Sequence, residues 1–179
     1  MERMTSTLAV LGSHGTFASL VDAFLDHPKA LDGIPHWTPG NRKGERRIRW
    51  PVILVGQSCG ADLDLTGYPG EHDRFMIGLS FPTQIWRIDF ERVTRDPHVN
   101  PVDQVERLGI GTIFGPHFHA WVDNRYLATP KGLPELDCAR LMPPKIKGFP
   151  NALRWLCGET NIALTAAQMI DLPPRETLL

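Results

Sequence analysis

The sequence has few cysteines and no long hydrophobic run, and these absences exclude several classes of protein. Its three cysteines, Cys59, Cys138 and Cys157, are odd in number and lack the paired spacing of zinc-ribbon or redox motifs. No run of 18 apolar residues occurs, and the N-terminal segment lacks the apolar core and cleavage site of an export signal. We therefore expect a protein of the reducing cytoplasm that does not enter a membrane.

The chain also has almost no net charge. A formal charge of −1 gives no global field that would draw the whole surface onto nucleic acid or an anionic membrane. Any such binding must be local. With 179 residues, of which 42% are hydrophobic, the chain can bury a substantial core. We predict one α+β domain over residues 1–179, with an N-terminal helix within 1–30, a sheet core over 46–127 and C-terminal helices within 150–172.

Three regions show helical signals. Apolar residues at helical spacing follow Thr16, a good N-cap, and end at Pro28. A short helix is predicted after Asn100 as N-cap, with a stripe of Val102, Val105 and Leu108 and a stop at Gly109. Near the C-terminus we expect a helix over 151–157 and a last one that starts near Thr165, where Gln168 gives capping-box spacing.

Strand signals fill the middle of the chain. Four segments are rich in β-branched and aromatic residues and are separated by Gly, Pro and Asp: Ile48–Val55, Arg74–Phe81, Gln84–Glu91 and Ile113–Tyr126. The link 81–84 is short enough for a hairpin. We expect an antiparallel meander and a mostly antiparallel sheet of about four or five strands, with helices at the N- and C-termini.

The most informative stretch is Gly115–Asp123. Alternation along a strand puts His117, His119 and Asp123 on one face, together with Trp121. The two imidazoles would leave the backbone roughly 6 to 7 Å apart, which suits a shared ligand.

A neighbouring strand could complete this site. In Gln84–Glu91 the polar side chains Arg87 and Asp89 share one face, so pairing with the histidine strand would bring them to it. His98 and Asn100, on the intervening link, are placed to cover the site.

Three uses of this surface stay open. Neutral imidazoles bind zinc and other transition metals, and His117 and His119 with either His98 or Asp89 would supply three ligands to one ion. Without a metal or other cofactor, the same pair could act as acid and base on a phosphodiester or acyl group, with Asp89 orienting one ring and Arg87 and His98 on the phosphate side. Alternatively, the histidines could simply hydrogen-bond across a solvated sheet face.

One concentrated basic run lies ahead of the sheet. It could contact a phosphate backbone while Trp37 and Trp50 stack bases, although such runs are usually solvated loops. Its members are Arg42, Lys43, Arg46, Arg47 and Arg49. A further motif, Ser58 and Cys59 between two glycines, mimics a nucleophile turn but lacks a following helix, so a serine or cysteine hydrolase is a distant alternative.

Three motifs carry a resemblance to a known family. The strings Trp86–Asp89, His98–Asn100 and Gly115–His119 resemble an uncharacterised family of small bacterial and mobile-element proteins, a domain of unknown function with Arg-x-Asp, His-x-Asn and Gly-Pro-His-x-His motifs in this order. No established activity comes with the resemblance. A similar motif order in small toxin–antitoxin components favours an RNA-directed function by analogy.

These observations give three hypotheses. The first is a toxin-type, RNA-directed nuclease with His117 and His119 as acid and base. The second is a metal-binding protein or metal-dependent hydrolase that uses the same histidines. The third is a noncatalytic module, such as an antitoxin, an inhibitor or an assembly partner, that binds a cognate protein.

Overall fold

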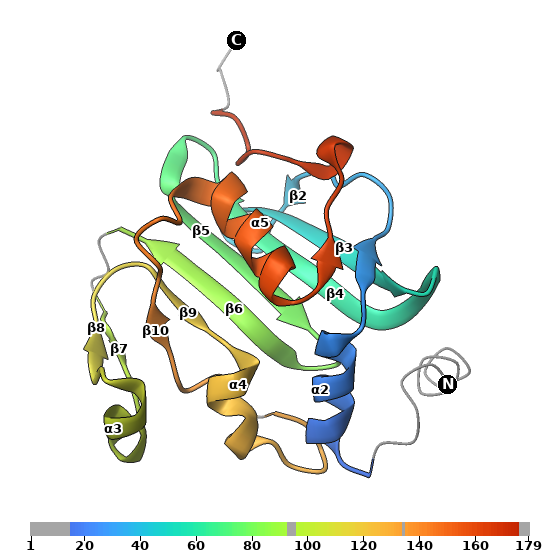
Figure 1. Ribbon diagram of the computed structural model, residues 1–179. Helices are drawn as coiled ribbons and strands as arrows, with labels where there is room; N and C mark the ends of the chain where they lie inside the picture. The colour runs from blue at the N-terminus through green and yellow to red at the C-terminus, as the bar shows by residue number, and fades with distance from the viewer. Residues whose placement is uncertain (1–14, 93–95, 134, 176–179) are drawn as a thin grey trace.

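A computed structural model describes residues 15–92, 96–133 and 135–175. One large, mixed but mostly antiparallel sheet forms the body, and a helix near the C-terminus lies across one of its faces (Figure 1). The α+β class is therefore confirmed. The predicted division into one domain stays a prediction, and its first fourteen residues lie outside the described part.

The helices and strands follow one another along the chain in a fixed order. They are α2 (Phe17–Asp26), β1 (Lys29–Leu31), β2 (Thr38–Pro39), β3 (Arg46–Leu54), β4 (Gln57–Tyr68), β5 (Glu71–Ser80), β6 (Gln84–Glu91), β7 (His98–Val99), η1 (Val102–Gln104), α3 (Val105–Leu108), β8 (Thr112–Ile113), β9 (His117–His119), α4 (Trp121–Asn124), η2 (Arg125–Leu127), β10 (Arg140–Leu141), α5 (Gly148–Glu159), β11 (Ile162–Ala163) and η3 (Ala166–Gln168).

The predicted helix at the start of the described chain is present. In α2 the Thr16 side chain accepts a hydrogen bond from the amide of Ser19, as an N-cap should. Val21 and Phe24 are buried, and the helix ends at Asp26, two residues before Pro28. Its apolar stripe therefore packs into the core as its spacing indicates.

The sheet is larger than predicted. Its nine strands include the main path β10-β9-β6-β5-β4-β3-β1-β11, with β2 paired to β3. The meander from β3 to β6 is antiparallel throughout, and the β5–β6 link is the predicted hairpin. The added strands are mostly two or three residues long, and such short segments leave no periodic pattern to detect.

Strand β4 is the main element that the prediction missed. The segment around Ser58 and Cys59 is no nucleophile turn but the start of this strand, which follows a two-residue turn of Val55 and Gly56, both with positive φ. Gly60 is also at positive φ, beside the register shift in the β3–β4 pairing. The glycines therefore mark a tight hairpin and an irregularity in the pairing.

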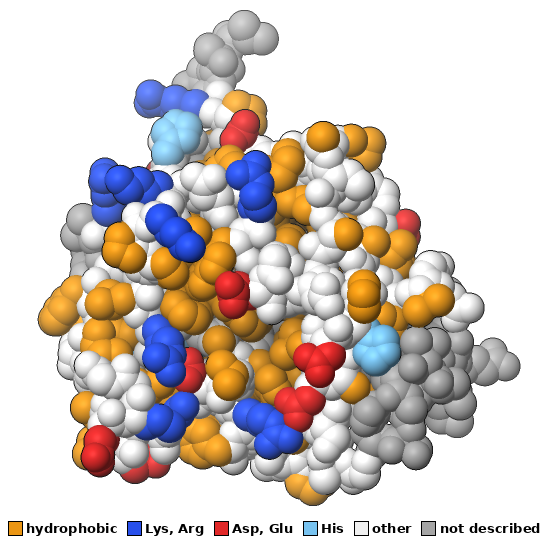
Figure 2. All heavy atoms as spheres, in the orientation of Figure 1, with side chains coloured by type: hydrophobic (Ala, Val, Ile, Leu, Met, Phe, Trp, Pro, Cys, Tyr) orange, Lys and Arg blue, Asp and Glu red, His pale blue; other side chains and the backbone are white. Residues whose placement is uncertain are grey.

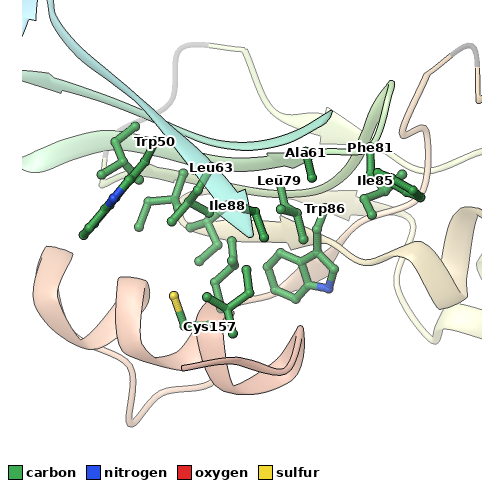
Figure 3. Close-up of a cluster of buried hydrophobic side chains, with 14 of the residues drawn as sticks. Trp50, Ala61, Leu63, Leu79, Phe81, Ile85, Trp86, Ile88 and Cys157 are labelled. Atoms are coloured by element: carbon green, nitrogen blue, oxygen red, sulfur yellow. The ribbon is translucent and has the colours of Figure 1, made fainter. Parts of the chain in front are cut away.

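The main core lies between the sheet and α5. Figure 3 shows Trp50, Leu63, Ile88 and Trp86 projecting from the sheet toward the helix that carries Cys157. The outer surface on the α5 side mixes hydrophobic with charged side chains, and Lys and Arg gather toward its upper left (Figure 2). Most of the apolar residues of β3 to β6 thus face one side, which leaves the other face to polar groups.

The predicted long strand Ile113–Tyr126 is wrong. The segment forms β8, β9 and α4 in turn, followed by the 3-10 turn η2. Asn124 explains the change of structure after His119, because its side-chain amide donates to the carbonyls of Ala120 and Cys138 and holds the chain in a turn. Trp121 is buried and donates its indole N–H to Asp22 of α2. Contacts with distant segments therefore override the local alternation.

The C-terminal predictions are met in part. Helix α5 contains the predicted segment 151–157 and extends it at both ends. The last predicted helix is a single 3-10 turn, η3, and Thr165 and Gln168 form its capping box. Among the described residues, none of the helices combines the length and apolar character needed to cross a bilayer.

Candidate metal centre

The site begins with the pairing of β6 and β9. These strands are antiparallel neighbours, with Asp89 opposite His117 and Arg87 opposite His119. Directly opposed side chains in such a pair lie on one face. The adjacency that the prediction required is therefore present.

A third imidazole reaches the pair from β7. The ring of His98 lies 5.3 Å from that of His117 and 4.8 Å from that of His119, while the His117 and His119 rings are 5.3 Å apart. One ring nitrogen from each of the three lies within 4.8 Å of the other two. We call these three residues the histidine cluster.

Two of the three rings are buried. His119 has no exposed surface and His117 is only 7% exposed, so the solvated sheet face that the third alternative assumed is wrong at this point. The reason is that β10 pairs with the outer edge of β9, and His98 packs against both rings. Buried polar groups need partners, which makes their hydrogen bonds informative.

Main-chain carbonyls orient two of the three rings. His117 Nδ1 lies 2.9 Å from the carbonyl oxygen of Gly115, and His98 Nε2 lies 2.9 Å from that of Asp137. A carbonyl only accepts, so each of these nitrogens carries the donated hydrogen. In the neutral rings, the lone pairs are therefore on His117 Nε2 and His98 Nδ1.

Asn100 holds His98 in place rather than capping a helix. Its side-chain oxygen lies 3.2 Å from His98 Nε2 and accepts from the amide of Ala139, while its Nδ2 donates to the carbonyls of Ile110 and Ala139. The predicted N-cap role is wrong, because this buried amide bridges two distant loops. The predicted stripe also fails in part, since Val102 is 90% exposed while Leu108 is buried and Gly109 ends the helix as expected.

The third ring, His119, faces an ion pair. Arg87 Nε donates to Asp89 Oδ2 at 2.6 Å, and Arg87 Nη2 lies 3.0 Å from His119 Nε2. Asp89 Oδ2 lies 3.3 Å from the same nitrogen. His119 Nδ1 is buried and has no hydrogen-bond partner among the described residues. An unsatisfied buried polar atom costs about 1–3 kcal/mol and often marks a functional site.

Burial shifts the protonation of the cluster. It lowers the pKa of His119 to about 4, with Asp89 opposing and Arg87 adding to the shift. Burial and the neighbouring His117 also lower the pKa of His98. Burial raises the pKa of Asp89, but the hydrogen bond to His119 and the charge of Arg87 outweigh it, and the net pKa is below its usual value. At neutral pH, His98 and His119 are therefore uncharged and Asp89 is ionised.

Two predicted members do not join the site. Asp123 is buried in α4, where it pairs with Arg107 at 3.1 Å and Arg140 at 2.7 Å. Trp121 packs toward α2, as described above. Both positions depended on a strand that continued past His119, and the chain leaves the sheet there.

The basic run is divided: Arg42, Lys43 and Arg46 line one pocket, and Arg47 and Arg49 do not. Arg49 pairs with Asp62, and Arg47 lies 3.9 Å from Glu45. Trp50 is buried in the core, so its predicted stacking on bases is wrong. Trp37 packs on Phe149 of α5 and donates its indole N–H to the carbonyl of Asp171.

An open pocket borders the cluster. Its volume is about 640 Å³, and its lining includes Gln84, Arg87, His98 and Asp137. Arg87 also donates to Gln84, at 3.3 Å. Sequence reasoning missed Gln84 and the carbonyls of Gly115 and Asp137, and carbonyl partners leave no residue-type signal that could reveal them.

Comparisons with protein-family models, curated proteins and solved structures return no match for this chain. The resemblance of its three motifs to an uncharacterised bacterial family therefore stays a prediction. The histidine cluster itself is therefore the main indication of function.

Proposed function

We propose that this protein binds one transition-metal ion, with zinc as the first candidate, through His98, His117 and His119, and that the ion serves hydrolytic chemistry. The observation that carries the proposal is the convergence of three imidazoles, two of which donate their outer N–H to main-chain carbonyls. A carbonyl that accepts the N–H of a metal-binding histidine fixes the tautomer of the ring and aims its lone pair at the ion.

The electrostatics of the cluster favour a cation. In neutral His117 the lone pair is on Nε2, which lies 3.6 Å from Asp89 Oδ2, another acceptor. Two acceptors at this distance are stabilised by a positive charge close to both. A metal ion would supply that charge. The unpartnered Nδ1 of His119 also indicates a missing interaction.

The number of ligands favours a catalytic ion. Three histidines leave a fourth position of a tetrahedral zinc site open for water, and zinc lowers the pKa of that water to about 7. Ligand nitrogens around zinc are about 3.3 Å apart at Zn–N distances of about 2.0–2.1 Å. The rings here would therefore have to close by small rotations, and His98, on its short strand pair, is the ligand with most freedom to move.

Two charged residues would assist the reaction. Asp89 is ionised and within reach of two rings, so it can orient an imidazole or accept a proton from a bound water. Arg87 lines the pocket and can neutralise an anionic substrate or the charge that develops on it. A phosphodiester is the substrate class that suits this pair.

Metal-free acid and base catalysis on RNA is the second candidate. Arg87 and Asp89 beside His119 favour it, because they resemble a phosphate clamp and an orienting carboxylate. However, burial lowers the pKa of His119, so in that mechanism His119 would have to act as the base rather than the acid. The convergence of a third imidazole, His98, on the other two is what favours the metal centre over this candidate.

Elemental analysis of protein purified without an affinity tag tests the proposal. We expect about one zinc or other transition-metal ion per chain, and binding at least 100-fold weaker in His117→Ala, which removes a direct ligand rather than an outer partner. His72→Ala removes an exposed histidine outside the cluster and should bind metal like the wild type. Wild-type protein that takes up no stoichiometric metal, even after incubation with zinc, manganese, iron or nickel, would contradict the proposal.

A further inference from the structure

A strongly basic pocket lies at the end of the sheet where β4 turns into β5. It has a volume of about 680 Å³, and its lining carries five cationic side chains but only one carboxylate, Glu71. The cations are Arg42, Lys43, Arg46, Arg74 and Arg175. A hollow with such an excess of positive charge favours an anionic ligand.

Part of this charge is available to a ligand. Arg42 and Lys43 have no side-chain hydrogen bond or ion pair with the described residues. Arg74 lies over the ring of Tyr68 at 4.0 Å and is shared between Glu71 and Glu91 at 3.4 and 3.7 Å. The pocket therefore combines solvated cations with an aromatic wall.

The basic pocket continues toward the histidine cluster. A second hollow, of about 370 Å³, shares Arg42, Tyr68 and Arg74 with it and extends to Asp89. The carboxylates of this second hollow are paired with arginines, as in Glu91 with Arg74 and Asp89 with Arg87. These pairs remove most of the repulsion that an anionic chain would meet.

The strand register shows that this path crosses the sheet. Thr66 of β4 is opposite Arg47 of β3, Met76 of β5 is opposite Thr66, Asp89 is opposite Met76, and His117 is opposite Asp89. Four steps between strands at about 4.8 Å each give a span of roughly 19 Å. A mononucleotide cannot reach both ends of this path, whereas a chain of phosphates can.

We propose that the basic pocket binds the phosphate backbone of a single-stranded nucleic acid and leads the strand across the sheet to the histidine cluster. The half-buried ring of Tyr68 lines the path and offers a face on which a base stacks without regard to sequence. The strand leaves past Arg87 into the pocket beside His98. Single-stranded nucleic acid would then be the substrate of the proposed hydrolase. Only the hydrolysis of the strand at the metal rests on the proposed function, whereas binding of the strand does not.

The test compares two charge-matched double variants. Arg42→Gln/Lys43→Gln removes two cations of the basic pocket, whereas Lys131→Gln/Arg154→Gln removes two exposed cations that line none of these hollows. Binding of labelled single strands of about 12 nucleotides, one of RNA and one of DNA, is measured at several salt concentrations with a chelator present to stop cleavage.

We expect the pocket variant to bind on the order of tenfold more weakly and the control variant to bind like the wild type. Two lost phosphate contacts should reduce the slope of log affinity against log salt by about 1.4, so that between about 50 and 200 mM salt the wild type loses roughly sevenfold more affinity than the variant. The RNA and DNA arms show which sugar is preferred, and pocket-dependent binding of either supports the proposal.

Equal affinities and slopes for the two variants would overturn the proposal, as would tighter binding of a duplex of the same sequence. Metal content is measured in the same preparations before the chelator is added. Pocket-dependent binding by a wild type that held no metal before chelation would refute the proposed function and leave this inference intact. Conversely, protein that held metal before chelation but binds neither strand refutes the inference alone.

Discussion

At the scale of single residues, burial decides what the histidines can do. An imidazole on an open strand titrates near its ordinary pKa and can exchange protons at neutral pH. His119 has no contact with solvent, and burial lowers its pKa to about 4. A histidine that is buried on a strand is therefore a better metal ligand than proton donor. The burial, rather than the residue type or its position on the strand, lowers its pKa.

The depressed pKa of His119 predicts an acid-sensitive metal-free protein. Its unfolded pKa is near 6.5 and its folded pKa is about 4, so the unfolded state binds the proton more tightly. Stability is complete above pH 6.5 and falls as the pH is lowered toward 4, by up to about 3 kcal/mol from this group.

Urea unfolding of chelator-treated protein from pH 8 to pH 4 measures this effect, with His119→Gln as the comparison. The variant lacks the titrating ring and should lose less stability across the same range. Parallel profiles for the two proteins would contradict the prediction.

At the scale of elements, polar side chains connect segments that are far apart in sequence. Asn100 joins the loops at Ile110 and Ala139, and Asp123 joins Arg107 with Arg140. These contacts attach the β7–β8 pair and α3 to the main sheet. His98 therefore owes its position to side chains that are not themselves in the cluster.

The end of α2 offers a direct test of such a contact. Lys29 is buried, and its ammonium donates to the carbonyls of Phe24, Leu25 and His27, which have no partners within the helix. We expect Lys29→Met to lower the free energy of unfolding by roughly 2–4 kcal/mol, because the apolar replacement leaves buried carbonyls unpaired. Denaturant unfolding checks this, with exposed Lys131→Met as the control. A loss no larger in Lys29→Met than in the control would show that water replaces the ammonium without cost.

At the scale of the whole molecule, the strands β3 to β6 form the middle of the main sheet, and the β7–β8 pair is a small separate sheet. Within the described residues, β7 and β8 pair as strands with each other in a two-stranded sheet, whereas β4, β5 and β6 are flanked by strands on both sides. Local opening of the small pair separates His98 from the other two histidines. A metal ion bound by all three would oppose that opening.

Amide hydrogen exchange should reveal this difference. In metal-free protein, residues 98–113 should exchange faster than β4 and β6, because short pairs open at lower free energy than central strands. Addition of the metal should slow exchange in 98–113 by about tenfold or more and leave β4 unchanged. Metal that fails to protect this segment would show that His98 is not a ligand.

Local sequence patterns determined several parts of this protein. The Thr16 cap and apolar stripe of α2, the alternation of β6 and the short link before it all depend on residues within one turn or one hairpin of each other. The neighbouring histidines of β9 and the polar face of β6 follow from the same period of two. For this reason, His117 and His119 share one face of β9, and Arg87 and Asp89 share one face of β6, as predicted.

Only the tertiary structure decided the rest, because it depends on contacts between distant segments. The sequence pattern did not reveal the long strand β4, because its glycines belong to a turn and to an irregular pairing. Asp123 lies outside the site because the chain leaves the sheet after His119, where the side chain of Asn124 bonds to Cys138. Burial of the cluster required β10 and His98 to close over β9, and neither arrangement is encoded near the histidines themselves. Because burial lowers the pKa of His98 and His119, the fold rather than the local sequence sets the protonation state of these two rings.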